Sequence, residues 1–136
     1  MEKPYDFRCM DFVKIEELKH LSSNGNGSTY GFESVSPSKG RLLAFRKAGS
    51  ISGNHWHTGR SSAKDPEELV LISGSIKLVL KRPESLDFEE EYIIQGPCRI
   101  LIYKNTFHRL EALNDICFLE FNSLKEHQED TFYPKD

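Results

Sequence analysis

The sequence has no long apolar run, no excess of one charge and few cysteines, and each of these absences excludes a class of protein. Its apolar stretches are far shorter than the roughly 20 residues of a membrane-spanning helix, so we expect no membrane partner. Its 18 basic and 21 acidic residues are well mixed and give a formal net charge of −3. No basic face stands out, which argues against a nucleic-acid partner. The three cysteines, Cys9, Cys98 and Cys117, show no disulfide pattern and favour a reducing compartment.

The chain also lacks the apolar stretch of a signal peptide within residues 1–20. Together with the cysteines, this predicts a cytoplasmic location. No shift in composition divides the chain, so we expect one domain over residues 1–136. Within it we expect a barrel core at about residues 40–122, an N-terminal arm at 1–39 and a C-terminal tail at 123–136.

What the chain does contain is a series of short apolar segments from Arg41 onward, separated by turn signals such as Gly49 and Gly74. Residues 75–82, SIKLVLKR, alternate along a period of two, which is typical of a strand with one wetter face. We count about seven or eight such segments with turns every eight to twelve residues, a pattern that predicts an antiparallel sandwich or barrel.

The remaining segments are less regular. Residues 12–21 are expected to form a short strand followed by a turn of helix. Residues 22–31, rich in Ser, Asn and Gly, are predicted to be a loop. Residues 58–66 and the charged residues 83–91 are also expected to be loops. The tail at 123–136 is polar, and we expect it to be helical or extended over the surface.

The stretch GNHWH, residues 53–57, contains the most informative pair of side chains. On a strand, residues two apart point to the same face, so His55 and His57 are expected to lie together. Adjacent antiparallel strands would bring Glu67 and His108 to them. Three histidines and a carboxylate suit Fe, Mn, Zn, Ni or Cu ions without choosing among them. A His-x-His pair alone fits cross-strand packing equally well.

These residues stand in a pattern that resembles the cupin family. Its first motif matches Gly53, His55 and His57 followed by Glu67, six residues and Gly74, and its second matches Gly96-PCRILIYKNTF-His108. The resemblance covers about residues 40–122. It implies an all-β fold, an antiparallel jelly-roll β-barrel with little helix. It also implies a metal site whose ligands are His55, His57, Glu67 and His108.

The chain departs from the family pattern at three points. The nine residues 58–66 separate His57 from Glu67 where the family usually has a much shorter spacing. This insertion leaves Glu67 and Glu68 as alternatives for the inward carboxylate. The Pro-x-Gly turn of the second motif is replaced by Tyr103 and Asn105. The position of the motif's asparagine holds Ala112, with Asn114 two residues later.

A closer similarity points to cupins that act on nucleotide sugars in surface-polysaccharide biosynthesis. Its residues are the GNHWH stretch, EELVLISGSIKLVL at 67–80 and the ending EFNSLKEHQEDTFYP at 120–134. Relatives of this type include sugar ketoisomerases and the cupin domain of capsule-type reductase/epimerases. The resemblance implies an isomerase or epimerase in which the histidines transfer protons, since histidine titrates near neutrality.

Candidate catalytic residues are therefore His55, His57, His108 and Tyr103, with a tyrosine or a histidine hydrogen-bonding the enediolate oxygen. Arg99 and Tyr103 are alternatives for contact with a sugar or phosphate, or surface residues. A divalent metal (Zn, Fe, Mn or Ni) and a metal-free site both stay open. So do two other functions, an iron-dependent dioxygenase and a non-catalytic cupin that binds a small ligand.

Other positions receive weaker expectations. His20 and His127 lie in polar segments and are predicted to be surface residues. Trp56 is expected to pack outward. Glu120 is equally compatible with a buried functional group and an edge residue.

A homodimer is expected because small barrels commonly pair to cover their sheet edges. The N-terminal segment, with Phe7, Phe12, Val13 and Ile15, is the candidate for adding a strand to a neighbouring chain.

Overall fold

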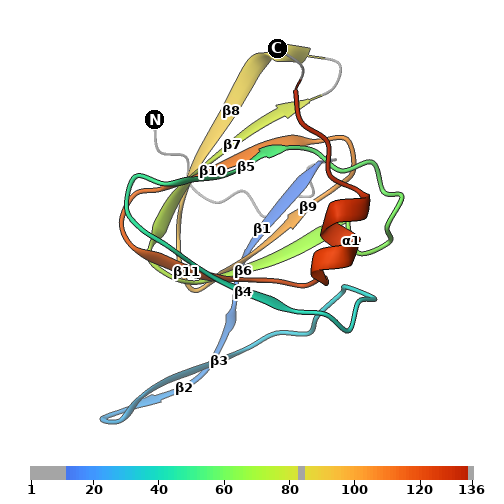
Figure 1. The fold of residues 1–136 in the computed structure, drawn as a ribbon. Coiled ribbons are helices and arrows are strands. Elements are labelled where there is room, and N and C mark those ends of the chain that lie inside the picture. The colour runs from blue at the N-terminus through green and yellow to red at the C-terminus, as the bar shows by residue number, and fades with distance from the viewer. Residues whose placement is uncertain (1–11, 83–84, 135–136) are drawn as a thin grey trace.

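The fold comes from a computed structural model that describes residues 12–82 and 85–134. Strands dominate the described residues, and a single short helix follows them (Figure 1). In chain order the elements are β1 (Val13–Glu17), β2 (Lys19–Asn24), β3 (Gly27–Gly31), β4 (Leu42–Arg46), β5 (Ile51–His55), β6 (Glu67–Ser73), β7 (Ser75–Arg82), β8 (Ser85–Gln95), β9 (Cys98–Ile102), β10 (Phe107–Ala112), β11 (Ile116–Glu120) and α1 (Leu124–Glu129).

Two antiparallel sheets form the body of the molecule. One sheet has five strands in the order β1-β9-β6-β11-β4, and the other has four in the order β5-β10-β7-β8. Neighbours in the order are often far apart in sequence, as in a jelly roll, and the sheets enclose a common interior (Figure 1). The prediction of an all-β antiparallel barrel is confirmed.

The period-two pattern of β7 explains its packing. Ile76, Leu78 and Leu80 are each at most 1% exposed and point into the core. Ile100 and Ile102 of β9 face them from the other sheet and are equally buried. Burial of such side chains contributes about 1.5–3 kcal/mol each to folding, so the two inner faces fix the relation of the sheets.

The N-terminal arm contributes a strand to the barrel. β1 pairs with β9 of the same chain, with Val13 opposite Ile102, and it is the edge strand of the five-stranded sheet. The addition of this segment to a neighbouring chain stays a prediction. Phe7 lies outside the described residues. The expected turn of helix near residue 20 and the expected loop at 22–31 are both wrong, because β2 and β3 form a hairpin that projects from the body (Figure 1). Ser, Asn and Gly serve a hairpin turn as well as a loop, and composition does not distinguish them.

The charged residues before Tyr92 are also a strand and not the expected loop. β8 pairs with β7 along its length, and its glutamates face lysines of that strand. Glu91 lies 3.9 Å from Lys77, and Glu89 lies 3.5 Å from Lys81. These two ion pairs therefore lie on the solvent-facing side of the sheet, while Tyr92 is buried on the other side. Residues 83–84 are outside the described part.

The tail folds back across one end of the barrel. Ser123 and Glu126 form a capping box that starts α1, which confirms the helical alternative for the tail. The helix covers the open end between the two sheets (Figure 1). Within residues 12–82 and 85–134, no helix has both the length and the apolar character needed to span a membrane.

Candidate active site

Three histidines meet at the end of the barrel that α1 covers. His55 ends β5 and lies opposite His108 of β10, and His57 follows just beyond the strand. The ring centroids of His55 lie 4.7 Å from those of both His57 and His108. Gly53 makes this approach feasible, because its φ is +82° and a Cβ there would lie 3.0 Å from the carbonyl oxygen of His108. The structure thus brings together the three histidines that the sequence singled out.

Glu67 is the carboxylate that faces this cluster. Its Oε2 lies 3.1 Å from His57 Nε2, and its Oε1 lies 3.2 Å from His108 Nε2. Glu68, the alternative, is equally buried but points to the other side of β6. There its Oε1 accepts hydrogen bonds from Ser34 Oγ and from the backbone N–H groups of residues 35 and 36. Glu68 therefore anchors the preceding segment, and Glu67 belongs to the site.

Backbone carbonyls fix the orientation of two of the rings. His57 Nδ1 lies 2.6 Å from the Asp130 carbonyl oxygen, and His108 Nδ1 lies 3.0 Å from that of Thr106. A carbonyl oxygen only accepts, so both Nδ1 atoms carry the proton. Each Nε2 is consequently directed at Glu67.

His55 differs from the other two because its Nδ1 has no hydrogen-bond partner among the described residues. Burial, followed by the neighbouring His108 and His57, lowers the pKa of His55 to about 2. His55 is therefore a neutral imidazole with a free ring nitrogen.

The carboxylates have opposite pKa shifts. Burial alone would raise the pKa of Glu67, but the Lys64 ammonium and then His108 and His57 hold it well below its usual range. Burial raises the pKa of Glu120, and the negative charge of Glu67 raises it further. Glu67 is therefore the permanent negative charge of the site, and Glu120 is the carboxyl that gains a proton more readily.

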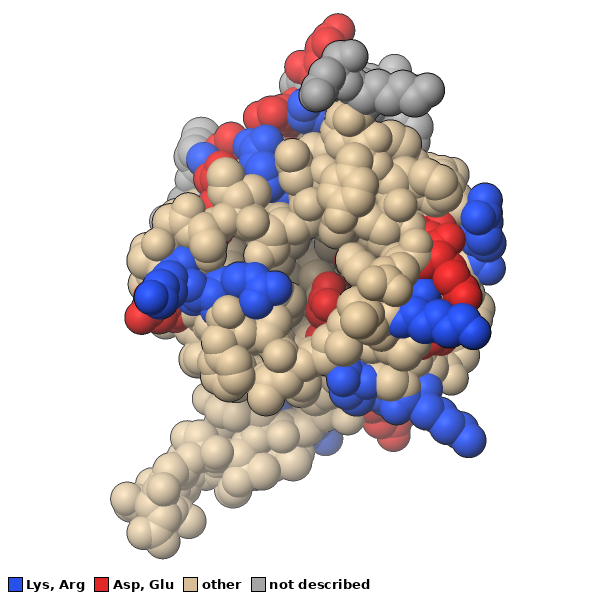
Figure 2. All heavy atoms as spheres, viewed as in Figure 1, with Lys and Arg blue, Asp and Glu red and all other residues tan. Residues whose placement is uncertain are grey.

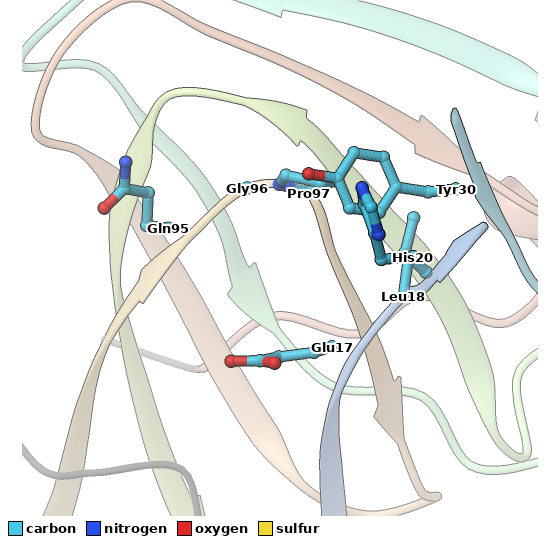
Figure 3. Close-up of a pocket in the computed structure, with 7 residues that line it drawn as sticks. All are labelled: Glu17, Leu18, His20, Tyr30, Gln95, Gly96 and Pro97. Atoms are coloured by element: carbon cyan, nitrogen blue, oxygen red, sulfur yellow. The ribbon is translucent and has the colours of Figure 1, made fainter. Parts of the chain in front are cut away.

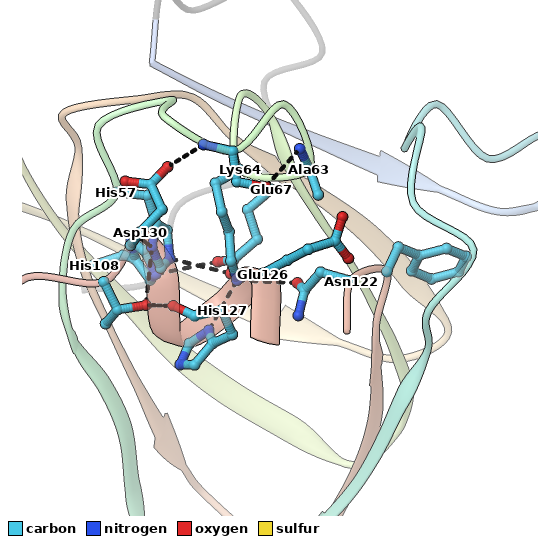
Figure 4. Close-up of polar contacts among 12 residues, drawn as sticks. His57, Ala63, Lys64, Glu67, His108, Asn122, Glu126, His127 and Asp130 are labelled. Atoms are coloured by element: carbon cyan, nitrogen blue, oxygen red, sulfur yellow. Dashed lines mark hydrogen bonds and ion pairs between the residues drawn. The ribbon is translucent and has the colours of Figure 1, made fainter. Parts of the chain in front are cut away.

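Lys64 was not anticipated from the sequence. Its ammonium lies 2.5 Å from Glu67 Oε2, 3.0 Å from Asn122 Oδ1 and 2.9 Å from His127 Nδ1 (Figure 4). The prediction that His127 is a surface residue is wrong, since it is half-buried and its pKa is lowered to about 4 by burial and by Lys64. A lysine in a polar loop and a histidine in a polar tail carry no signal of burial.

The tail is tied to the residue 58–66 loop by Asp130, a buried carboxylate. It accepts hydrogen bonds from the backbone N–H groups of Thr58, Gly59 and Ser61 and from the Thr58 hydroxyl, at 2.8–3.1 Å. Beyond it, the Tyr133 ring lies 5.5 Å from that of His55. The tail thus supplies one wall of the site.

Trp56 packs against this tail. Its ring stacks on Phe132 at 6.3 Å between centroids, and the two residues exchange backbone hydrogen bonds.

Tyr103 is not brought to the histidines. It follows β9, where its backbone N–H donates to the Phe12 carbonyl, and its phenol acts electrostatically on Lys14. Arg99 also lies away from the cluster and binds Glu16 and Glu68. No contact within the described residues supports the predicted catalytic role of Tyr103.

A small cavity adjoins the cluster. It measures about 30 Å³, and its lining includes His55, Glu67, His108 and Glu120. Figure 2 shows a hollow on this face of the molecule with acidic atoms at its floor. The volume suits about one or two water molecules and is far below the roughly 300 Å³ at which ligand pockets begin.

A larger hollow lies at the base of the β2–β3 hairpin. It measures about 420 Å³, and His20 and Tyr30 line it together with the β8–β9 turn (Figure 3). The His20 and Tyr30 rings contact each other at 5.3 Å, and His20 is exposed, as predicted. No buried charge or ring nitrogen among the described lining residues points into this hollow, so the histidine cluster is the better candidate for chemistry.

The donor atoms of His55, His57 and His108 lie within 4.8 Å of one another, as metal ligands do. The carbonyl-bound Nδ1–H groups of His57 and His108 are also typical of ligating histidines. Glu67, however, is already paired with the Lys64 ammonium at 2.5 Å. A divalent ion bound there would stand beside a positive charge. The predicted set of His55, His57, Glu67 and His108 therefore does not fit a divalent metal while Lys64 is in place.

No protein-family model and no curated protein matches the chain. Solved structures do match in fold. QdtA, a sugar 3,4-ketoisomerase from Thermoanaerobacterium thermosaccharolyticum solved with TDP, has a TM-score of 0.72 at 17% identity, over 93% of this chain and 90% of that one. A 3,4-ketoisomerase from Helicobacter canadensis has a TM-score of 0.63 at 21% identity, over 83% of each chain.

An epimerase also matches. RmlC, a dTDP-6-deoxy-D-glucose-3,5-epimerase from Legionella pneumophila solved with dTDP-4-keto-L-rhamnose, has a TM-score of 0.65 at 18% identity. The match covers 91% of this chain and 73% of that one. These likenesses show that the chain has the cupin-type fold of such proteins, as its motifs suggested.

Proposed function

We propose that the chain is an isomerase or epimerase acting on a keto sugar linked to a nucleotide. One observation carries the proposal: three histidines converge around a single buried carboxylate at the end of a barrel. Solved proteins of the same fold are 3,4-ketoisomerases and a 3,5-epimerase. One fold hosts many functions, so the side chains and not the fold must support the reaction.

The reaction requires two proton transfers. A base removes the proton from the carbon beside the ketone, and the C–H electron pair forms an enediolate. Protonation of the former carbonyl carbon, with loss of the other hydroxyl proton, moves the ketone to its neighbour. Protonation of the original carbon on the opposite face inverts its configuration instead. Histidine suits both transfers because it accepts and donates protons near neutrality.

The geometry suggests distinct roles for the histidines. His55 lines the cavity and its Nδ1 has no partner among the described residues, so this nitrogen is available to the substrate. Its pKa of about 2 comes first from burial, and a shift of the tail that admits solvent and substrate raises that pKa toward the range in which His55 accepts a proton. His108 faces the same cavity, and its Nε2 lies 3.2 Å from Glu67, whose negative charge stabilises an imidazolium. His57 does not line the cavity, and we infer that it positions Glu67 and the tail.

Access to the cavity requires movement of the tail. A cavity of about 30 Å³ does not hold a sugar ring, and the Tyr133 ring of the tail contacts the ring of His55, which lines the cavity. We propose that residues 122–134 shift when the substrate binds, with the nucleotide lying across the mouth of the barrel.

The proposal is tested by proton exchange with solvent. The protein is incubated in D₂O with a panel of dTDP- and UDP-linked 4-keto sugars, and NMR follows deuterium uptake beside the carbonyl. We expect uptake with at least one of them, and none with His108→Asn. Absence of uptake across the panel would remove the proposal, and binding of TDP without exchange would leave a ligand-binding cupin. The dioxygenase alternative is not favoured, since Glu67 is paired with Lys64 and not free for iron.

We also propose that the protein is a cytoplasmic homodimer. Cys98 and Cys117 are free thiols, in keeping with a reducing compartment.

The dimer is supported by the β2–β3 hairpin. A lone two-stranded hairpin has little stability in water, and Leu21 of this hairpin is 55% exposed. A second copy that covers it explains why it stays folded. We expect sedimentation at micromolar concentration to give the mass of two chains and Leu21→Asp to shift it toward one; a monomeric wild type would contradict the dimer.

A further inference from the structure

Lys64 is completely buried, which is rare for a lysine unless it is paired. Its ammonium has three N–H donors and contacts three acceptors, Glu67 Oε2, Asn122 Oδ1 and His127 Nδ1, at 2.5–3.0 Å (Figure 4). The acceptors come from β6, from the residue after Phe121 and from α1. The Lys64 ammonium is therefore enclosed by hydrogen-bond acceptors that belong to separate parts of the fold.

The same surroundings are suited to a metal ion. Donor atoms of His57, Glu67 and His127 lie within 4.8 Å of one another. Two nitrogens and a carboxylate oxygen form a common ligand set for Zn²⁺ and Co²⁺, with bonds of about 2.0–2.2 Å. Asn122 Oδ1, which also accepts from Lys64, offers a fourth ligand atom.

Lys64 lies beside these ligand atoms because the long segment of residues 58–66 separates the histidine pair from Glu67. The loop at residues 58–66 is fixed by Asp130 at its start, and Lys64 pairs with Glu67 as an isolated β-bridge at its end. A shorter connection between His57 and Glu67 would place no side chain at the position of the Lys64 ammonium. The insertion that departs from the cupin pattern is therefore what delivers a cation to the carboxylate.

We propose that the Lys64 ammonium takes the place of a divalent metal ion in a cage formed by His57, Glu67 and His127, and that its removal opens a metal site there. Glu67 supplies one negative charge, and Lys64 already neutralises it. A dication added beside the ammonium is repelled, whereas without the ammonium it gains the free carboxylate and both imidazoles. The inference concerns metal binding and does not depend on the proposed reaction.

The test is titration with Co²⁺, whose visible absorption reports its ligands, on wild type and on Lys64→Met. Methionine keeps the length of the side chain without its charge. We expect Lys64→Met to bind one equivalent about 100-fold or more tightly than wild type. The gain should disappear in Lys64→Met/His127→Ala and persist in Lys64→Met/His55→Ala, because His55 is not part of this cage.

Two results would overturn the inference. One is a folded Lys64→Met protein that binds Co²⁺ no better than wild type. The other is wild type that itself binds one equivalent with the affinity of the variant. If Lys64→Met is unfolded alone, circular dichroism with and without Zn²⁺ decides: recovery of the folded spectrum on adding Zn²⁺ supports the cage, and no recovery rejects it.

Discussion

Replacing His55 by asparagine is expected to lower kcat of the proposed isomerisation by about 10²–10⁴-fold, the range that a positioned acid or base supplies. The reason is that His55 is the one histidine of the cluster whose Nδ1 is not used by the protein. Its loss removes a proton acceptor from the cavity. Since no hydrogen bond to that atom is broken within the described structure, we expect the melting temperature to change little.

The measurement is the rate of ketone migration or deuterium uptake with the best substrate of the panel, together with thermal unfolding. His20→Asn is the matched control, because His20 is exposed on the β2–β3 hairpin, away from the cluster. Its rate should equal that of wild type. A His55→Asn protein that retains full activity would exclude His55 as the proton acceptor.

Replacing Asp130 by alanine is expected to lower the free energy of unfolding by about 3 kcal/mol or more, because buried donors are left without an acceptor. Asp130 is 0% exposed, and its two oxygens accept the N–H groups of Thr58, Gly59 and Ser61 and the Thr58 hydroxyl. Urea unfolding of the purified proteins gives the difference. Glu129→Ala is the control, since Glu129 is exposed and its contact with Lys125 is 3.9 Å long; we expect it to stay within about 0.5 kcal/mol of wild type.

The Asp130 effect also has a definite dependence on pH. Burial alone would raise the pKa of Asp130, but the N–H and hydroxyl groups of residues 58–61 lower it below the usual 3.8. A carboxyl with a lowered pKa in the folded state stabilises the protein above its unfolded pKa, and this stability is lost as pH falls through the folded value. The difference in the free energy of unfolding between wild type and Asp130→Ala should therefore become smaller below pH 3.8. If this difference is constant with pH, the charge of Asp130 contributes nothing to stability.

The sequence predicted the strand-rich fold because period-two alternation is a local property. The pattern of β7 is readable from eight residues, and its burial follows it. β8 was missed since its glutamates lie on the wet face opposite lysines of β7, and a run of charge resembles a loop when its partner strand is unknown. The β2–β3 hairpin was missed because its turn has the composition of any loop.

The sequence likewise predicted some residues of the candidate site and not others. His55, His57, Glu67 and His108 could be named because a spacing pattern connects them. Lys64 could not, since its burial depends on Asn122 and His127, which lie 58 and 63 residues further along the chain. The prediction for Tyr103 rested on residue type alone, and the structure places its backbone N–H against the carbonyl oxygen of Phe12.

The position of Asp130 after β11 also bears on the order in which the site folds. Its carbonyl oxygen orients His57 across a separation of 73 residues, and the ribosome releases this part of the chain after every strand of the barrel. A nascent or truncated chain that stops after β11 retains the strands of both sheets but leaves His57 without its carbonyl and Lys64 without Asn122 and His127. Closure of such long loops is entropically costly and slow. The contacts that Asp130, Asn122 and His127 make with His57 and Lys64 should therefore form late in folding, after the strands of the barrel.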